Sequence, residues 1–125
     1  MGSVALDASV LIALLEPKDP HNERALELLQ TRAREQRPFI ASASAYAEAL
    51  VGAIRRGTED IVEGFIDDTG TRIIDINRPL ARRAAGLRAK HRSLRMGDAL
   101  VLATAQEYDA ELLTFDEKLR RIASR

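Results

Sequence analysis

The sequence predicts a three-layer α/β fold, in which helices cover both faces of a central parallel sheet of four to five strands. Four short, mostly apolar runs have the length of buried strands: residues 4–6, 38–41, 72–76 and 111–114. Helical stretches separate these runs, and strands that alternate with helices form parallel sheets. The segment 97–108 is apolar on nearly every side, so we expect it to be the most buried helix.

The helices begin and end at residues with clear capping preferences. With their caps, the seven predicted helices cover residues 8–16, 19–35, 42–56, 58–70, 77–91, 97–108 and 116–123. Asp19 and Pro20 are suited to the cap and first position of the second helix, and Ser42 or Ser44 caps the third. Apolar residues recur at helical spacing in the third helix and are expected to face the core: Ala47, Leu50, Val51 and Ile54.

The composition indicates one folded domain, residues 1–125. Apolar residues make up 46% of the chain and charged residues 30%, so disorder is not expected. No run reaches membrane-spanning length, and the absence of cysteine excludes disulfides and thiolate metal sites, which fits a cytoplasmic location. The net charge is zero and aromatic residues are few, which argues against nucleic-acid binding through bulk charge or through a base-stacking surface.

Four acidic residues stand where the ends of the predicted elements should meet. Asp7 directly follows the first strand, and Asp116 follows the fourth strand by two residues. Glu48 lies early in the third helix and Asp98 in the first turn of the most buried helix. In an open α/β sheet the carboxyl ends of the strands share one edge, so we expect these carboxylates to gather there.

The four acids have the chemistry of a divalent metal site. Crowded carboxylates repel one another, and their pKa values rise unless a cation lies among them. Hard oxygen ligands select Mg²⁺ or Mn²⁺. Such an ion can orient water, lower its pKa and stabilise charge on a transferred phosphoryl group. Since neither His21 nor His91 is placed as a general base, metal-activated water is the simplest mechanism.

Each of these residues also has a purely structural explanation. Asp98 and Asp116 are suitable helix caps, and Glu48 fits a solvated helix face. Asp7 is the hardest to explain in this way, because an acid directly after a core strand needs a partner. Ser9 and Thr114 are either hydroxyls that support the ligands or a capping and a turn residue.

The stretch 76–96 contains no acid and is rich in arginine and lysine. A solvated helix face explains this charge without any ligand. Alternatively the stretch is a track for RNA phosphates beside the acidic site, carried by Arg82, Arg83 and Arg88.

The ordered set of acids resembles the PIN-domain ribonucleases, especially the VapC toxins of bacterial toxin–antitoxin pairs. The matching motifs follow one another along essentially the whole chain: VALDASVLI at 4–12, DPHNERA at 19–25, SAYAE at 44–48, GDALVLATA at 97–105 and LLTFD at 112–116. Asp7, Glu48, Asp98 and Asp116 look like the four acids of that family.

This resemblance implies a Mg²⁺- or Mn²⁺-dependent endoribonuclease in which the four acids hold the metal and the attacking water. Ser9 and Thr114 would support the ligands. The family further implies cleavage of structured RNA such as tRNA or rRNA, a toxin homodimer, and a cognate VapB-like antitoxin whose tail blocks the site. Many relatives continue into a fifth strand where this sequence stops at Ser124 and Arg125, so four or five strands both remain open.

Three other functions compete with this one. A haloacid-dehalogenase-like phosphatase also has an aspartate after its first strand, but it needs an acid two residues later, where this chain has Ser9. A receiver domain needs a phosphoacceptor after its third strand, and Asp75 lies within that run instead. A degenerate PIN domain that acts only as a binding module has no need of all four acids.

Overall fold

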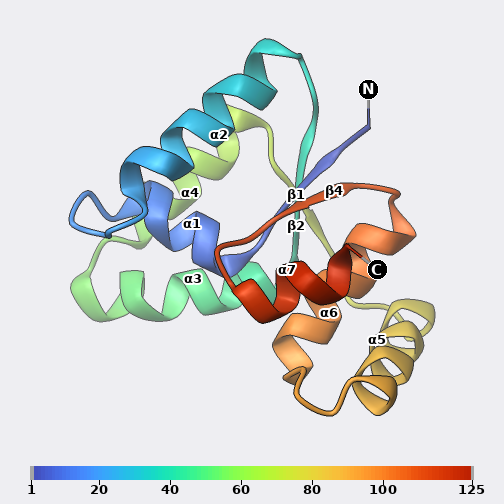
Figure 1. Ribbon diagram of the computed structural model, residues 1–125. Coiled ribbons are helices and arrows are strands. Elements are labelled where there is room, and N and C mark those ends of the chain that lie inside the picture. Colours follow the sequence, from blue (N-terminus) through green and yellow to red (C-terminus); the bar gives the residue numbers. More distant parts are fainter. Residues whose placement is uncertain (1, 125) are drawn as a thin grey trace.

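A parallel sheet of four strands lies at the centre of the computed structural model, which describes residues 2–124 (Figure 1). The strands are β1 (Val4–Leu6), β2 (Phe39–Ser42), β3 (Arg72–Ile74) and β4 (Glu111–Leu113). Their order across the sheet is β3-β2-β1-β4, and each neighbouring pair is parallel. The predicted α/β sandwich is therefore confirmed, with four strands in the described part of the chain.

Seven helices flank the sheet within residues 2–124: α1 (Ala8–Leu15), α2 (Asn22–Arg34), α3 (Ala43–Arg56), α4 (Glu59–Thr69), α5 (Arg78–Lys90), α6 (Met96–Glu107) and α7 (Glu117–Ala123). The chain passes from β1 through β2 to β3 and then returns across the sheet to β4. Because such crossovers are right-handed, α1 to α4 lie on one face and α5 and α6 on the other, as Figure 1 shows. The strand order reverses direction beside β1, so the carboxyl ends of β1 and β4 meet at the switch point where ligands bind in open α/β sheets.

Helix α6 contributes six buried residues, the most of any helix within residues 2–124, although the shorter α1 is buried over a larger share of its length, with five of its eight residues. Alanines alternate with larger apolar residues along it, and its buried residues are Ala99, Val101, Leu102, Ala103, Thr104 and Ala105. The small side chains let α6 pack directly against β1, β2 and α5. This packing fixes the start of α6, which carries Asp98, relative to the end of β1.

Helix α3 packs with a different face from the one predicted. Its buried residues are Ala45, Ala49 and Ala53, whereas Val51 and Ile54 are 49% and 61% exposed. Two apolar stripes run along this helix, and the predicted stripe is the one with the larger side chains. The alanine stripe faces inward because it allows a close approach to α1 and α6, which the larger residues would prevent.

Two predicted boundaries are also wrong by two residues. Helix α2 begins at Asn22 and not at Pro20, because Asp19 Oδ1 accepts the His21 backbone N–H at 2.8 Å and forms a turn there. Strand β3 ends at Ile74, since β2 offers its last ladder partner, Ser42, at that position. The predicted caps Ser42 and Asn77 are confirmed, because their side chains accept the N–H of Ala45 and Leu80 respectively.

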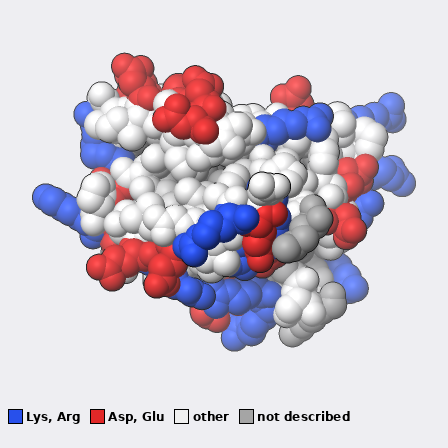
Figure 2. Space-filling view, turned by 90° about the horizontal axis from the view of Figure 1, so that it is seen from above, with Lys and Arg blue, Asp and Glu red and all other residues white. Residues whose placement is uncertain are grey.

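The surface away from the carboxyl ends carries charges of both signs. Figure 2, seen from above the view of Figure 1, shows lysine and arginine interspersed with aspartate and glutamate, without a continuous patch of either sign. This agrees with the zero net charge of the chain. No helix within residues 2–124 is long and apolar enough to cross a membrane.

A cluster of ion pairs ties the end of α2 to β4. Glu111 accepts hydrogen bonds from Arg32 at 2.8 Å and from Arg37 at 2.7 Å. These bonds lower the pKa of the Glu111 carboxyl, with Arg32 as the largest cause. Arg37 also donates to the Gly2 carbonyl, so the same cluster holds the start of the chain.

The variant Glu111→Gln should be less stable than the wild type at pH 7, by less than about 1 kcal/mol for each of these partly exposed pairs. Because the folded-state pKa is lowered, the stabilisation is present above the unfolded-state value of about 4.3 and is lost as the pH falls through the folded-state pKa. Urea unfolding at pH 7 and pH 3 tests this, and the difference should be smaller at pH 3 than at pH 7. Glu27→Gln is the control, since its pair with Arg24 is highly exposed. An equal loss at both pH values would contradict this account.

Candidate active site

The site is built from loops and helix starts that meet at the carboxyl ends of β1 and β4. Asp7 follows β1, and Thr114 and Asp116 follow β4. Glu48 lies in the second turn of α3, and Asp98 lies in the first turn of α6. The sheet reverses its winding direction at this edge, so four segments that are distant in sequence come together.

Asp7 is the most enclosed of the four acids, with 6% of its surface exposed. Its Oδ2 accepts the hydroxyls of Ser9 at 3.0 Å and Thr114 at 2.7 Å. Among residues 2–124, none of the hydrogen bonds goes to Oδ1. One carboxylate oxygen is thus held by the protein, and the other keeps its lone pairs available for a ligand.

The two hydroxyls are themselves held in place by backbone groups. Ser9 Oγ accepts the Phe115 N–H at 3.0 Å, and Thr114 Oγ1 accepts the Asp116 N–H at 3.0 Å. Since each oxygen accepts from the backbone, its own proton is directed to Asp7. The loop after β4 and the turn after β1 are therefore locked together around the Asp7 carboxylate.

Glu48 reaches the site from α3 and lies against the start of α6. A Cβ atom added to Gly97 would lie 2.5 Å from Glu48 Oε1, so glycine is needed for the carboxylate to occupy this position. Burial raises the pKa of Glu48, and the negative charges of Asp7 and Asp98 raise it further, while Arg95 lowers it. The three carboxylates therefore share one electrostatic field that is not fully compensated.

Asp98 completes this group of three acids. Its side chain is 13% exposed, and one oxygen lies 3.4 Å from Nε of Arg95, whose own side chain is 79% exposed. Arg95 and Asp98 are three residues apart at the start of α6, so the guanidinium stands at the rim of the site. The sequence placed Arg95 only within the basic stretch, although its spacing from Asp98 was a signal for this contact.

Asp116 lies beside the group but acts as a helix cap in this structure. Its Oδ1 accepts the Leu119 N–H at 3.0 Å at the start of α7. It is linked to Asp7 through the Thr114 hydroxyl, which its backbone N–H supports. The structure thus brings Asp7, Glu48 and Asp98 together, and places Asp116 on the adjoining turn.

The donor set fits a divalent cation that prefers oxygen. Among residues 2–124, no three His, Cys, Asp or Glu side chains already stand as a group that could hold a metal ion. Desolvation is the largest cause of the raised pKa of Glu48, and repulsion from Asp7 and Asp98 adds to it, which a cation would relieve. The Asp7 oxygen without a hydrogen bond and the Glu48 and Asp98 carboxylates would supply the ligands, and such oxygens favour Mg²⁺ or Mn²⁺.

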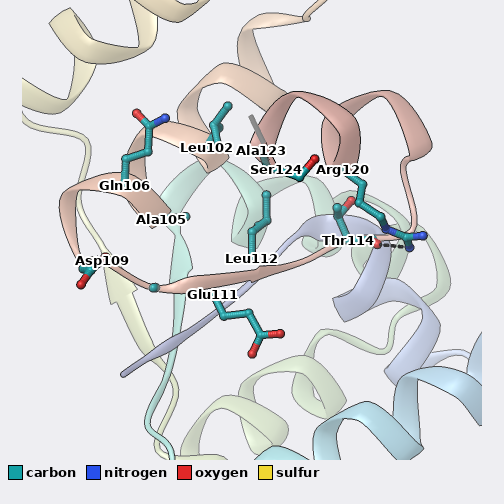
Figure 3. Close-up of a pocket in the computed structure, with 11 residues that line it drawn as sticks. Leu102, Ala105, Gln106, Asp109, Glu111, Leu112, Thr114, Arg120, Ala123 and Ser124 are labelled. Carbon is teal, nitrogen blue, oxygen red and sulfur yellow. Dashed lines mark hydrogen bonds between the residues drawn. The ribbon is translucent and has the colours of Figure 1, made fainter. Parts of the chain in front are cut away.

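A separate hollow of about 360 Å³ lies beside the free edge of β4, between α6 and α7 (Figure 3). In Figure 3, Leu112 points into it toward Leu102, and the dashed line marks the 2.7 Å bond from Arg120 to the Thr114 carbonyl. None of the four acids lines this hollow. Its walls are mostly apolar, so we do not assign it to the metal site.

The three arginines expected to contact RNA lie on α5, and they differ in their distance from the acids. Arg83 pairs with Glu107 at 3.2 Å, at the far end of α6 from Asp98. Asp98 and Glu107 are nine positions apart, which corresponds to about 13 Å along a helix. Arg88 donates to the Arg92 carbonyl in the loop before α6 and so stands nearer the acidic edge than Arg82 and Arg83.

The family model described as "PIN domain" matches residues 4–125. No curated protein matches the chain.

Solved structures with the same fold come from several bacteria. A toxin–antitoxin complex from Klebsiella pneumoniae is 29% identical, with 93% of this chain and 88% of that chain covered and a TM-score of 0.73. The sarcin–ricin-loop-cleaving VapC toxin of Mycobacterium tuberculosis is 17% identical, with coverage of 96% and 95% and a TM-score of 0.74. A VapBC complex from Rickettsia felis, bound to a promoter DNA fragment, is 19% identical, with coverage of 95% and 92% and a TM-score of 0.73.

The family model covers nearly the whole chain, and the fold agrees with toxin–antitoxin proteins of the same architecture. The resemblance read from the acids is thereby confirmed. This chain belongs to the PIN-domain family.

Proposed function

We propose that this protein is a Mg²⁺- or Mn²⁺-dependent endoribonuclease and the toxin of a type II toxin–antitoxin pair. The observation that carries the proposal is the Glu48 carboxyl, whose pKa is raised by burial and by the adjacent Asp7 and Asp98. Asp7 is buried, Asp98 is half-buried and Glu48 is exposed. Gathering these three acids without a full set of cationic partners is unfavourable for folding, so their presence together points to chemistry. PIN-domain membership and the toxin–antitoxin neighbours support the same function.

Each residue has a defined role in this mechanism. Asp7, Glu48 and Asp98 hold the cation, and Asp116 joins them from the turn before α7. When bound, the metal supplies a water of lowered pKa and stabilises charge on the phosphate. Ser9 and Thr114 hold Asp7 Oδ2 and so orient its other oxygen. Water attacks phosphorus in line, a P–O bond of the RNA backbone breaks, and the leaving oxygen takes up a proton.

Positive charge at the rim supports binding of the RNA backbone. Arg95 is highly exposed beside Asp98. Arg88 lies near the end of α5 that leads into the loop before α6. The contacts of Arg82, Arg83 and Arg88 with RNA stay a prediction from charge, and the position of Arg83 makes it the weakest member of that set. Structured RNA such as tRNA or rRNA remains the proposed substrate.

The remaining assignments concern partners and location. A VapB-like antitoxin is the proposed partner, because the neighbouring structures include toxin–antitoxin complexes. We further propose a homodimer, a single domain over residues 1–125 and a cytoplasmic location. These follow from the family and not from a contact seen in this chain.

Purified protein should cut total RNA when Mg²⁺ or Mn²⁺ is added and stop when EDTA removes the metal. It should leave p-nitrophenyl phosphate intact, because Ser9 stands where a phosphatase of the haloacid-dehalogenase type needs an acid. Gel analysis of the RNA and absorbance of nitrophenol measure the two activities. Hydrolysis of the monoester without RNA cleavage would favour the phosphatase. Binding of RNA without cleavage under every metal condition would favour a degenerate binding module.

A further inference from the structure

An aromatic stack stands next to the acidic site and has no role in the metal chemistry. The His21 ring lies on the Phe115 ring with 4.5 Å between centroids and 10° between planes. His21 is exposed and Phe115 is half-buried. Because Phe115 covers only one face of the imidazole, the other face is open to a planar ligand.

The stack is held at a fixed position relative to Asp7. The Phe115 N–H donates to Ser9 Oγ at 3.0 Å, and Ser9 Oγ donates to Asp7 Oδ2 at 3.0 Å. His21 is anchored at the start of α2, where its N–H donates to Asp19 Oδ1 and its carbonyl accepts the Ala25 N–H at 2.8 Å. Two hydrogen bonds therefore connect the aromatic platform to the most buried ligand of the proposed metal site.

Both rings of the stack line a hollow of about 520 Å³ between α2 and β4. This volume lies in the range of sites that hold small ligands. The hollow is lined by both rings, by Leu28 and by the guanidinium groups of Arg24 and Arg120. The hollow therefore combines a flat aromatic end, an apolar wall and cationic groups.

The charges around the hollow leave Arg120 able to bind a phosphate, whereas Arg24 is already paired with Glu27 at 3.1 Å. Arg120 donates to the Thr114 carbonyl at 2.7 Å and pairs with Glu117 at 3.2 Å, which uses two of the five N–H groups of a guanidinium. Glu111 also lines the hollow, but Arg32 and Arg37 already neutralise it.

We propose that this hollow binds one nucleotide of the RNA strand beside the scissile phosphate. Its base stacks on the open face of His21, and Arg120 contacts its phosphate. Single-stranded RNA is commonly held by stacking of bases on aromatic rings together with cationic contacts to the backbone. The proposal rests on the ribonuclease function proposed above and adds a position at which the enzyme holds its substrate.

An abasic scan combined with a substitution tests this directly. The probe is a fluorescein-labelled single-stranded oligoribonucleotide that the wild type cuts, together with versions that lack one base at each position near the cut. Binding is measured by anisotropy in EDTA, where no cleavage occurs, for wild type, His21→Ala, His21→Trp and His91→Ala. His91 is the matched control, because it lies at the end of α5 away from the stack.

Stacking of one base is worth about 1–3 kcal/mol, so His21→Ala should weaken binding about tenfold. At one position of the oligonucleotide, loss of the base should weaken binding to the wild type by a similar factor. Loss of the same base should leave the affinity of His21→Ala almost unchanged. His21→Trp should restore the affinity, and His91→Ala should keep the full effect of the missing base. Unfolding temperatures should be unchanged, since His21 is exposed.

Two kinds of result would overturn the proposal, and only one of them would also overturn the proposed ribonuclease function. If the wild type cuts RNA while His21→Ala binds as tightly as the wild type, only the nucleotide position is wrong. Fully additive losses from His21→Ala and each missing base would lead to the same conclusion. If the wild type neither binds nor cuts RNA, the ribonuclease function fails and this subsite fails with it.

Discussion

The substitution Asp7→Asn should lower the rate of RNA cleavage by about 100- to 1,000-fold, the scale found when one preorganised charge-stabilising group is lost. An amide binds a divalent cation less tightly than a carboxylate, and Asp7 is the most enclosed of the acids. The fold should survive, because the amide oxygen can still accept the hydroxyls of Ser9 and Thr114. Initial cleavage rates at saturating Mn²⁺ and thermal unfolding measure the two effects.

Asp75→Asn provides the matched control for this prediction. It makes the same chemical change at an exposed residue between β3 and α5, and it should cut RNA at the wild-type rate. It also examines the receiver-domain alternative, in which Asp75 was the nearest phosphoacceptor. Normal cleavage by a correctly folded Asp7→Asn protein would show that the metal site has been placed wrongly.

The substitution Gly97→Ala should separate activity from stability. The added Cβ would lie 2.5 Å from Glu48 Oε1, so the Glu48 carboxylate must move away from the start of α6. Displacement of a catalytic group by about 1 Å can cost about 100-fold in rate. Unfolding should not suffer, because only the tip of a flexible side chain has to move, and alanine is favoured over glycine in a helix by roughly 0.5–1 kcal/mol.

Calorimetric titration with Mn²⁺, cleavage rates and urea unfolding test this prediction together. Gly86→Ala is the control, since it lies within α5 and an added Cβ meets no atom within 4 Å. We expect Gly86→Ala to gain similar helix stability without loss of metal affinity or rate. If Gly97→Ala binds Mn²⁺ and cuts RNA like the wild type, Glu48 does not need its present position.

Packing against other elements explains where the structure departs from the sequence-based predictions. The alternation of strands and helices is local, because it depends on the period of apolar residues. The local sequence does not determine which face of α3 points inward. Its two apolar stripes are equally helical, and only the close approach of α1 and α6 selects Ala45, Ala49 and Ala53 over Val51 and Ile54.

In the acidic site too, the local sequence predicts some features and packing decides the others. The positions of Asp7, Glu48 and Asp98 could be predicted together, because strand ends and helix starts converge where the winding of a parallel sheet reverses. The state of Glu48 could not be predicted, since its raised pKa depends on how closely Gly97 lets it approach α6. The sequence also allowed Asp116 to be a ligand or a cap, and the structure shows its capping bond to Leu119.

The sequence by itself determined the class of fold and predicted the acids of the proposed site, because both depend on residue type and on order along the chain. Only the tertiary structure decided which groups touch. It directed the hydroxyls of Ser9 and Thr114 onto one oxygen of Asp7, and it stacked His21 on Phe115 in a chain whose few aromatic residues argued against such a surface. These contacts join segments from opposite ends of the chain. The distances between such segments are set by the packing of helices on both faces of the sheet, so no periodic pattern in the sequence predicts them.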